Sequence, residues 1–377
     1  MPGIYIHIPF CKQRCNYCNF HFSTQLQHTA SFIDALKVEM ALQRHYLPPG
    51  SVKTLYVGGG TPSILTPGQV RDIFSSLEAT LEVDIRNMEE VTFEVNPDDI
   101  SEAYLRELKD AGVKRLSIGI QSFKEADLRF MHRAHTMEQS QYAIEAAVSS
   151  GFDNVSIDLI YGISGLSHEE WVAHIEKAVR FGITHISAYA LTVEPRTLLE
   201  QQVRHQKVPP LDEEQAAVQF ELLVRTLAAH GYEQYEISNF ALPGHYAIHN
   251  TNYWKKEWYL GLGPSAHSFN GSSRQWNIAN NALYSGSLLQ RGELQHETEQ
   301  LTEADNWNEY VMTGIRTMWG LDLQYMNAHF RESFLEQLMK DIVPLQEKGW
   351  LESTPERIVL TLEGKLYADR IAGMLFV

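Results

Sequence analysis

Residues 11–18 read Cys-Lys-Gln-Arg-Cys-Asn-Tyr-Cys and contain all three cysteines of the 377-residue chain. The spacing C-x3-C-x2-C places three thiols within eight positions. An odd, clustered set of cysteines is a poor disulfide framework, and unrelated buried cysteines would be scattered along the sequence. The stretch therefore indicates a metal site near the amino terminus.

Two kinds of metal site are compatible with three clustered thiols. A structural zinc ion takes four ligands, and His7 or His21 could complete a Cys3His set, but the usual second short knuckle is missing. An iron–sulfur cubane held by three cysteines leaves one iron open to another ligand. Tyr17, just before the last cysteine, makes the motif a specific signature of such clusters.

Strand and helix patterns alternate after this stretch. Apolar or β-branched runs predict strands at 3–8, 52–58, 91–95, 115–120, 154–160 and 185–192. Helices are predicted between them, with Thr66, Ser101 and Ser167 as helix-capping residues. Alternating units predict an α/β fold in which a parallel sheet has helices outside. Six units favour a partial (β/α)6 barrel, and a doubly wound open sheet is the alternative.

Each predicted strand after the first carries a glycine-rich or polar feature at or near its carboxyl end, where parallel barrels place their chemistry. These features are Gly58-Gly59-Gly60-Thr61-Pro62, Glu94-Val95-Asn96-Pro97, Gln121-Ser122-Phe123, Asp158 and Tyr189-Ala190. The glycines could form a tight turn, or their N–H groups could bind a carboxylate. Arg133 could pair with a carboxylate or be a solvated helix charge. One central ligand is the common expectation.

These motifs, together with Tyr5-x-His7-x-Pro9-x-Cys11 and Asp158-Leu159-Ile160-Tyr161-Gly162, occur in the order of a known family. The chain resembles the radical S-adenosylmethionine superfamily, and within it the group of oxygen-independent coproporphyrinogen III dehydrogenase and its haem-chaperone relatives. In that superfamily the open iron chelates the amino and carboxylate groups of S-adenosylmethionine, and electron transfer into the sulfonium can release a deoxyadenosyl radical.

The resemblance carries site residues over to this chain. It implies a [4Fe-4S] cluster on Cys11, Cys15 and Cys18. It implies contacts to S-adenosylmethionine from Tyr5, Tyr17, Gly59, Gly60, Thr61, Glu94, Gln121, Arg133, Asp158 and Ala190. The family's usual Tyr-Gly-Leu-Pro after the fifth strand is here Tyr161-Gly162-Ile163-Ser164, which is a departure in that loop.

Two features separate the dehydrogenase from the chaperones. The dehydrogenase pattern has a further cysteine where this chain has Phe20, and it has a longer extension before the cysteines than the ten residues present here. The segment His249-Asn250-Thr251-Asn252-Tyr253-Trp254 resembles the proposed haem-binding motif of the chaperones. An imidazole such as His249 can be an axial iron ligand, although packing among aromatic side chains is the alternative for this histidine.

The sequence therefore favours a haem chaperone that binds haem, a [4Fe-4S] cluster and S-adenosylmethionine, and delivers haem to apo-proteins such as respiratory enzymes. A second copy of the chain, in a homodimer, is a further candidate partner. The alternative is an enzyme, the coproporphyrinogen III dehydrogenase. Whether S-adenosylmethionine is cleaved is open, and no catalytic residue is assigned.

Three domains are predicted. Residues 1–205 form the barrel, and residues 206–300 extend it with a helix at 212–230, the His249 segment and a glycine-rich loop at 259–268 that returns to the barrel mouth. Residues 301–377 show three helices and a β-hairpin, a winged-helix-like pattern. This last part has seven Lys and Arg against twelve Asp and Glu, which favours packing or partner docking over phosphate contacts.

The overall composition limits the partners. Lys and Arg number 31 and Asp and Glu 47, a net charge of −16, which argues against a general nucleic-acid binder. No run of about 18 apolar residues exists, so membrane contact is expected to be peripheral at most. The first residues lack the pattern of a signal peptide, and we expect a cytoplasmic protein.

Overall fold

The barrel strands stand in chain order. The computed structural model describes residues 1–377. Its parallel strands are β1 (Gly3–Ile8), β2 (Thr54–Gly59), β3 (Glu90–Val95), β4 (Arg115–Gln121), β5 (Asn154–Tyr161) and β6 (His185–Ala190), each paired with the next. A doubly wound sheet would reverse its strand order. The predicted partial (β/α)6 barrel is therefore confirmed.

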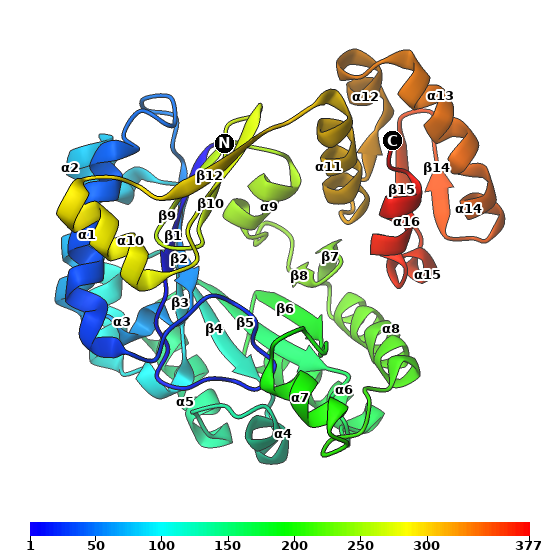
Figure 1. The fold of residues 1–377 in the computed structure, drawn as a ribbon. Coiled ribbons are helices and arrows are strands. Elements are labelled where there is room, and N and C mark those ends of the chain that lie inside the picture. Colours follow the sequence, from blue (N-terminus) through cyan, green and yellow to red (C-terminus); the bar gives the residue numbers. More distant parts are fainter.

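Helices cover the outer face of these strands (Figure 1). They are α1 (Thr29–Leu42), α2 (Pro67–Leu81), α3 (Glu102–Ala111), α4 (Glu125–Phe130), α5 (Met137–Ser149) and α6 (His168–Arg180), with 3-10 turns at Leu26–His28, Pro62–Ile64, Ile85–Asn87 and Pro97–Asp99. Thr66 and Ser167 each begin a helix with a capping box, and the Ser101 side chain accepts the N–H of Tyr104. The predicted helix starts are confirmed.

The sheet continues past both edges of the barrel, to twelve strands in all. Beside β6 lie β8 (Asn239–Ala241) and β7 (Glu233–Glu236); beside β1 lie β9 (Tyr259–Leu262), β10 (His267–Phe269), β11 (Ser273–Asn277) and β12 (His296–Gln300). The extra helices are α7 (Leu198–Arg204), α8 (Glu213–Ala229), α9 (Ile248–Trp254) and α10 (Asn281–Arg291). The helix predicted at 212–230 is thus present as α8.

The prediction of a loop over residues 259–268 is wrong. Tyr259–Leu262 is a strand that pairs in parallel with β1, and His267–Phe269 is a second strand, antiparallel to β9 and β11. A Cβ on Gly261 would collide with the carbonyl group of His267. Glycine weakens a strand on average, but here it permits a close approach between two backbones.

The C-terminal region has its own small sheet, in the order β13-β15-β14, and its own core around Trp307 (Figure 1). Its elements are α11 (Glu303–Ile315), β13 (Leu321–Asp322), α12 (Leu323–His329), α13 (Glu332–Asp341), α14 (Val343–Glu347), β14 (Leu351–Ser353), β15 (Arg357–Leu360), α15 (Leu362–Lys365) and α16 (Ala368–Met374). The predicted hairpin is confirmed. α13 and α14 are separated at Ile342, just before Pro344, whose ring cannot continue a helix hydrogen-bond ladder.

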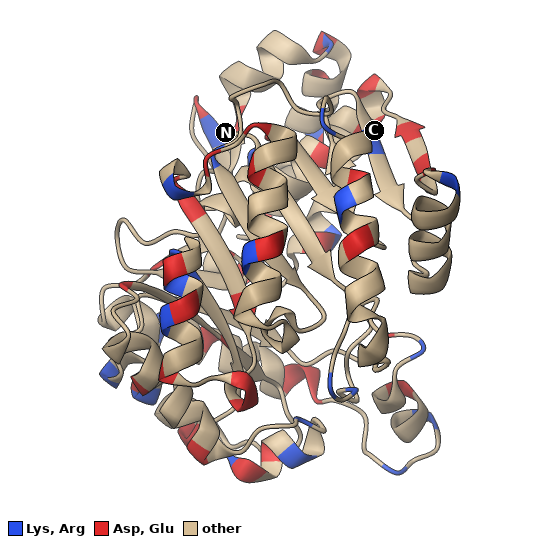
Figure 2. Cartoon of the chain, turned by 90° about the vertical axis from the view of Figure 1, so that its left-hand side faces the viewer, with Lys and Arg blue, Asp and Glu red and all other residues tan.

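Charges on the barrel helices are interspersed in sign (Figure 2). Lys37 of α1 pairs with Asp72 of α2 at 2.6 Å, and Arg71 of α2 pairs with Glu107 of α3 at 3.0 Å. Exposed pairs of this kind contribute at most about 1 kcal/mol each, so apolar packing holds these helices on the sheet. No helix combines the length and hydropathy that a membrane crossing requires.

A buried carboxylate ties α1 to the added strands. Glu39 is fully buried and accepts hydrogen bonds from Gly263 N at 2.7 Å, from Asn277 Nδ2 and from the Tyr284 hydroxyl. Burial raises the pKa of Glu39 to about 7 despite these donors. Three donors compensate the desolvated carboxylate, and they come from the loop after β9, from β11 and from α10.

We expect Tyr284→Phe to lower the free energy of unfolding by about 1–3 kcal/mol, because the buried Glu39 carboxylate loses a donor. The loss should be larger at pH 8 than at pH 6, since a protonated Glu39 needs fewer donors. Urea titrations at both pH values measure it. Tyr142→Phe, on an exposed tyrosine of α5, is the matched control, and equal stability of the two variants would contradict the role given to Glu39.

Candidate functional site

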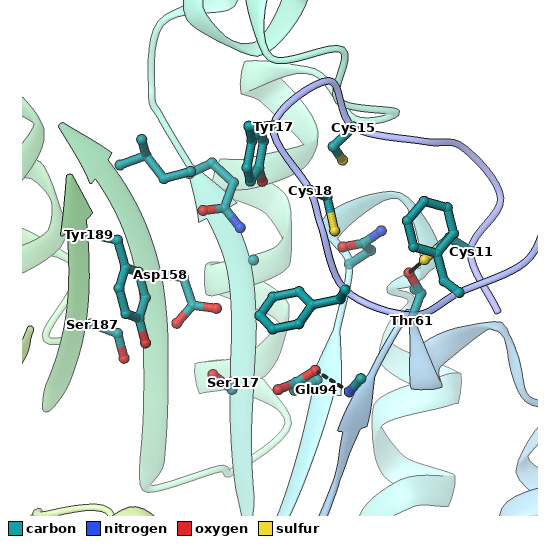
Figure 3. A pocket seen from close by; sticks show the side chains of 18 of the residues that line it. Cys11, Cys15, Tyr17, Cys18, Thr61, Glu94, Ser117, Asp158, Ser187 and Tyr189 are labelled. Carbon is teal, nitrogen blue, oxygen red and sulfur yellow. Dashed lines mark hydrogen bonds between the residues drawn. The ribbon is translucent and has the colours of Figure 1, made fainter. Parts of the chain in front are cut away.

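A cavity of about 560 Å³, here called the barrel cavity, opens inside the six parallel strands beneath the cysteine stretch (Figure 3). Every barrel strand contributes to its wall. Of the predicted site residues, the cavity gathers Tyr5, Cys11, Cys15, Tyr17, Cys18, Gly59, Gly60, Thr61, Glu94, Gln121, Arg133, Asp158 and Ala190. His249 is the one predicted residue outside it.

The cysteines lie on a loop without regular structure, between β1 and α1, and all three are half-buried. Asn16 fixes the middle of this loop. Its side-chain amide donates to the Phe130 carbonyl at 2.6 Å, its N–H donates to the Met131 carbonyl at 3.2 Å, and its carbonyl accepts Leu199 N–H at 2.8 Å. The loop is thereby held against the ends of α4 and α7.

The glycine run connects β2 to the start of the cysteine loop. Gly60 N–H donates to the Ile8 carbonyl at 2.9 Å, Thr61 N–H to the Phe10 carbonyl at 2.7 Å, and the Thr61 hydroxyl to Cys11 Sγ at 3.3 Å. Gly59 has a φ of +108°, and a Cβ there would meet the His7 ring at 2.6 Å. These N–H groups already donate to acceptors within the protein. They are therefore not free to bind the carboxylate of a ligand.

Two carboxylates project into the barrel cavity (Figure 3). Glu94 accepts from the Tyr56 hydroxyl at 2.7 Å and from Gly59 N–H at 3.2 Å. Burial is the main cause that raises the pKa of Glu94 to about 7 and that of Asp158 to about 6. Both carboxylates therefore favour a cationic ligand, which would restore the stability of their ionised forms. Both side chains line the cavity and are not charges on the outer surface of the protein.

Arg133 and Gln121 complete the upper wall of the cavity. Arg133 lies in a turn after α4, where its guanidinium donates to Asn96 Oδ1 at 2.8 Å, to the Gly119 carbonyl at 3.0 Å and to Cys15 Sγ at 3.4 Å. It is therefore not a solvated helix charge. Gln121 has a φ of +65° beside an irregularity in the β4–β5 pairing, a strained conformation of the kind that occurs at functional sites.

The donor set fits an iron–sulfur cluster better than a zinc ion. No three His, Cys, Asp or Glu side chains are arranged to hold a single metal ion. His7 Nδ1 lies 3.1 Å from the Tyr5 hydroxyl and its Nε2 lies 2.9 Å from the His21 carbonyl, so both nitrogens of this ring already have protein partners. His21 Nε2 lies 2.6 Å from Asn281 Oδ1. Three half-buried thiols at the mouth of a cavity, without a fourth protein donor, match a cubane with one open iron.

His249 is buried on α9, outside the barrel cavity, with 1% of its surface exposed. Its Nδ1 lies 2.9 Å from Thr54 Oγ1 and its Nε2 lies 2.8 Å from the Tyr253 hydroxyl. Burial lowers the pKa of His249 to about 3, so the ring is neutral. Both ring nitrogens have protein partners, and iron ligation by His249 requires one of these contacts to break.

The lysines that follow this segment contact the C-terminal region. Lys255 Nζ lies 4.6 Å from the centre of the Trp319 ring, and Lys256 Nζ pairs with Glu309 of α11 at 3.3 Å. The two lysines thus help to fix the C-terminal region against α9.

Comparisons with known proteins agree with this geometry. The radical SAM superfamily model matches residues 5–178, and the HemN C-terminal domain model matches residues 301–367. Heme chaperone HemW of Bacillus subtilis (strain 168) is 32% identical over 375 residues, covering 99% of this chain and 98% of the relative. HemW of Mycobacterium tuberculosis (strain H37Rv) is 34% identical over 379 residues, covering 99% and 94%. The chain belongs to the HemW family of the radical SAM superfamily.

A solved structure outside the HemW family shows the same fold. Coproporphyrinogen III oxidase (HemN) from Escherichia coli, described as a radical SAM enzyme, aligns with a TM-score of 0.86 at 23% identity. The alignment covers 100% of this chain and 90% of that one. At this identity the likeness establishes the fold alone.

Sequence reasoning missed polar residues that line the barrel cavity, among them Tyr56, Arg115, Ser117 and Ser187. Asn96, Tyr189 and Asn250 also line it, and they were quoted within motifs without being named as site residues. On β4, the residues Arg115, Ser117, Gly119 and Gln121 alternate with Leu116, Ile118 and Ile120. Successive side chains of a strand point to opposite faces, so Gln121 at the strand end already indicated the other three.

The raised pKa values make the stability of the ligand-free protein depend on pH. The folded form keeps a proton on Glu94 up to about pH 7, while the unfolded chain releases it near 4.5. Between these values the folded state binds more protons, so stability decreases as the pH rises. Glu94 contributes a decrease of up to about 3 kcal/mol, and Asp158 adds to it.

We therefore expect Glu94→Gln to weaken this decrease between pH 4.5 and 7, as measured by thermal unfolding of metal-free protein. Glu347→Gln, on an exposed residue of α14, is the control and should follow the wild-type curve. A pH profile of Glu94→Gln that superimposes on the wild type would show that Glu94 ionises normally.

Proposed function

We propose that this chain is a haem chaperone that binds haem and delivers it to apo-proteins such as respiratory enzymes. The observation that carries the proposal is identity of 32–34% over 99% of the chain to proteins named heme chaperone HemW. The alignment includes the His249 segment and the C-terminal region, so it extends beyond the catalytic barrel shared by radical SAM enzymes. A homodimer and a cytoplasmic location belong to the same proposal.

Cys11, Cys15 and Cys18 would hold a [4Fe-4S] cluster, and S-adenosylmethionine would occupy the barrel cavity below them. When bound, the cluster would supply an open iron that can chelate an amino-acid group. It would also supply a low-potential electron. Glu94 and Asp158 would balance the positive charge of the nucleotide, and Arg133 would stabilise the thiolate of Cys15 through its 3.4 Å contact. Tyr17 and Ala190, which both line the cavity, would help to position the nucleotide.

The dehydrogenase activity is the less favoured function. Phe20 stands where the dehydrogenase pattern has a further cysteine, and its side chain lies at the mouth of the cavity with 69% of its surface exposed. A phenylalanine offers no thiol chemistry there, but an exposed aromatic ring can pack on a flat ligand. This favours binding of a macrocycle over its oxidation.

The three predicted domains divide these roles. Residues 1–205 would hold the cluster and the nucleotide, residues 206–300 would carry the haem segment, and residues 301–377 would dock partners. In support, the C-terminal region has a core of 15 buried residues separate from the barrel core of 61.

Anaerobic reconstitution with iron and sulfide tests the proposal on the full chain. We expect about four iron atoms per chain, a Soret band when haem is added stoichiometrically, and no protoporphyrinogen or carbon dioxide from coproporphyrinogen III with reductant and S-adenosylmethionine. A Cys11→Ser, Cys15→Ser, Cys18→Ser variant is the control for the cluster. An unperturbed haem spectrum with wild-type protein rejects the chaperone, and turnover of the porphyrinogen supports the dehydrogenase.

The role of His249 can be tested separately. If its Nε2 ligates haem iron, Tyr253→Phe frees this nitrogen and should keep or tighten haem binding, whereas His249→Ala should remove the Soret shift. Haem titration of both variants measures this, with His205→Ala, an exposed histidine after α7, as the control. Wild-type spectra from His249→Ala would show that its role is to pack between Thr54 and Tyr253.

A further inference from the structure

Arg115 lies at the floor of the barrel cavity. It is the first residue of β4, and Gln121 at the other end of this strand lies beside the cysteine loop. A strand of seven residues spans about 20 Å, so the cavity extends from the cluster loop down the length of the strand. Asn250 of α9 lines the same cavity, and the floor thus reaches the segment that contains His249.

The Arg115 side chain has no partner in the protein. Only 2% of its surface is exposed, its Nε makes no hydrogen bond, and no carboxylate lies within 4.0 Å of the guanidinium. A buried guanidinium without a partner is costly. Such a group persists in a folded chain when something outside the chain satisfies it.

The neighbouring polar groups bond to one another instead. His185 lies between Ser156 and Tyr235, at 2.7 Å from each, and His249 lies between Thr54 and Tyr253. Glu94 is engaged by Tyr56 and Gly59. Across the sheet, Asn154 has an unpaired side-chain oxygen, but this acceptor is neutral and carries no counter-charge.

The charge around Arg115 is set by Glu94 and Asp158. The positive charge of Arg115 lowers the pKa of both carboxylates against the larger effect of burial, which places them in its electrostatic range without contact. A cationic nucleotide near these carboxylates would compete with Arg115 for their negative charge. The planar donors of Arg115 would then be matched by a second anion, and a carboxylate fits them in two parallel hydrogen bonds.

We propose that Arg115 binds the carboxylate of an organic acid that enters the barrel cavity. A haem propionate and the amino-acid carboxylate of S-adenosylmethionine share this chemistry. The resemblance to radical SAM proteins assigns the second of these to the open iron held by the cysteine loop, and Arg115 begins β4 at the end of the strand opposite Gln121, so the propionate is the favoured source. That assignment of the source rests on the proposed function; the carboxylate site itself does not.

The test uses anaerobically reconstituted full-length protein in four forms: wild type, Arg115→Met, Arg115→Lys and Arg71→Gln. Arg71 lies on α2 with 51% of its side chain exposed and serves as the matched control. The probes are haem, haem dimethyl ester, which has the same macrocycle without free carboxylates, and S-adenosylmethionine. Spectral titration measures the two haems, and equilibrium dialysis measures the nucleotide.

We expect Arg115→Met to bind haem about tenfold or more weakly, with Arg115→Lys intermediate because it keeps the charge but loses the planar fork. The dimethyl ester should bind the wild type and Arg115→Met equally. If the loss is instead confined to S-adenosylmethionine, the carboxylate site stands and the nucleotide is its source. Wild-type affinities of Arg115→Met for both carboxylate probes would overturn the proposal.

Two further results keep the outcomes separate. Because an unpaired buried charge is removed, ligand-free Arg115→Met should melt at or above the wild-type temperature; a decrease of more than about 3 °C would show a structural role and overturn the proposal. If the wild type binds no haem, the haem-chaperone function fails by itself. A loss of S-adenosylmethionine affinity in Arg115→Met would then still support the carboxylate site.

Discussion

The structure depends on strands that alternate in polarity although the sheet is parallel. Parallel strands with both faces covered are usually apolar throughout, yet here Tyr5, Glu94 and Asp158 face inward while Ile4, Phe93 and Ile157 pack under the helices. An open barrel with a polar interior cannot be filled by its own side chains at low cost. The polar interior is therefore suited to bind a ligand, and the cysteine loop lies over the open end of the cavity.

This constraint explains how the polar residues of the barrel are held. The loop from Cys11 to Cys18 has no regular structure. Asn16 fixes it through side-chain and backbone hydrogen bonds to the segment around Phe130 and Met131 and a backbone hydrogen bond to α7. The glycine run brings β2 close enough to β1 for Thr61 to reach Cys11. Hydrogen bonds to several elements thus hold the loop that carries the three thiols at the cavity mouth, as a preorganised ligand site requires.

Much of this was accessible from the sequence, and the reasons for the rest are physical. The six strands followed from apolar runs and the helix starts from capping residues, while the barrel order was the favoured one of two alternatives. Some cavity residues followed from motifs at strand ends, and the full set was implied by the family resemblance. Tyr259–Leu262 was missed because glycines that permit close strand packing look like those of a loop. Arg115 was missed because functional residues are expected at the carboxyl ends of barrel strands and not at their starts. The alternation of side chains along β4, counted back from Gln121, nevertheless points to it. Ion pairs such as the one between Lys256 and Glu309 could not be predicted, because they depend on tertiary contacts that no local sequence pattern indicates.

His249 and Arg115 differ in whether their buried polar atoms have hydrogen-bond partners in the protein. This difference helps to distinguish a structural residue from a ligand-binding one. The histidine stands in the motif that suggests a ligand, but both of its nitrogens are bonded to side chains, so its present geometry stabilises α9 against β2. The arginine stands in no motif, yet it is buried, charged and without a partner. Buried polar groups are nearly always hydrogen-bonded in folded proteins. An exception that lines a cavity, at the opposite end from the cluster loop, is the stronger physical indication of a ligand, because its guanidinium forms no hydrogen bond within the chain.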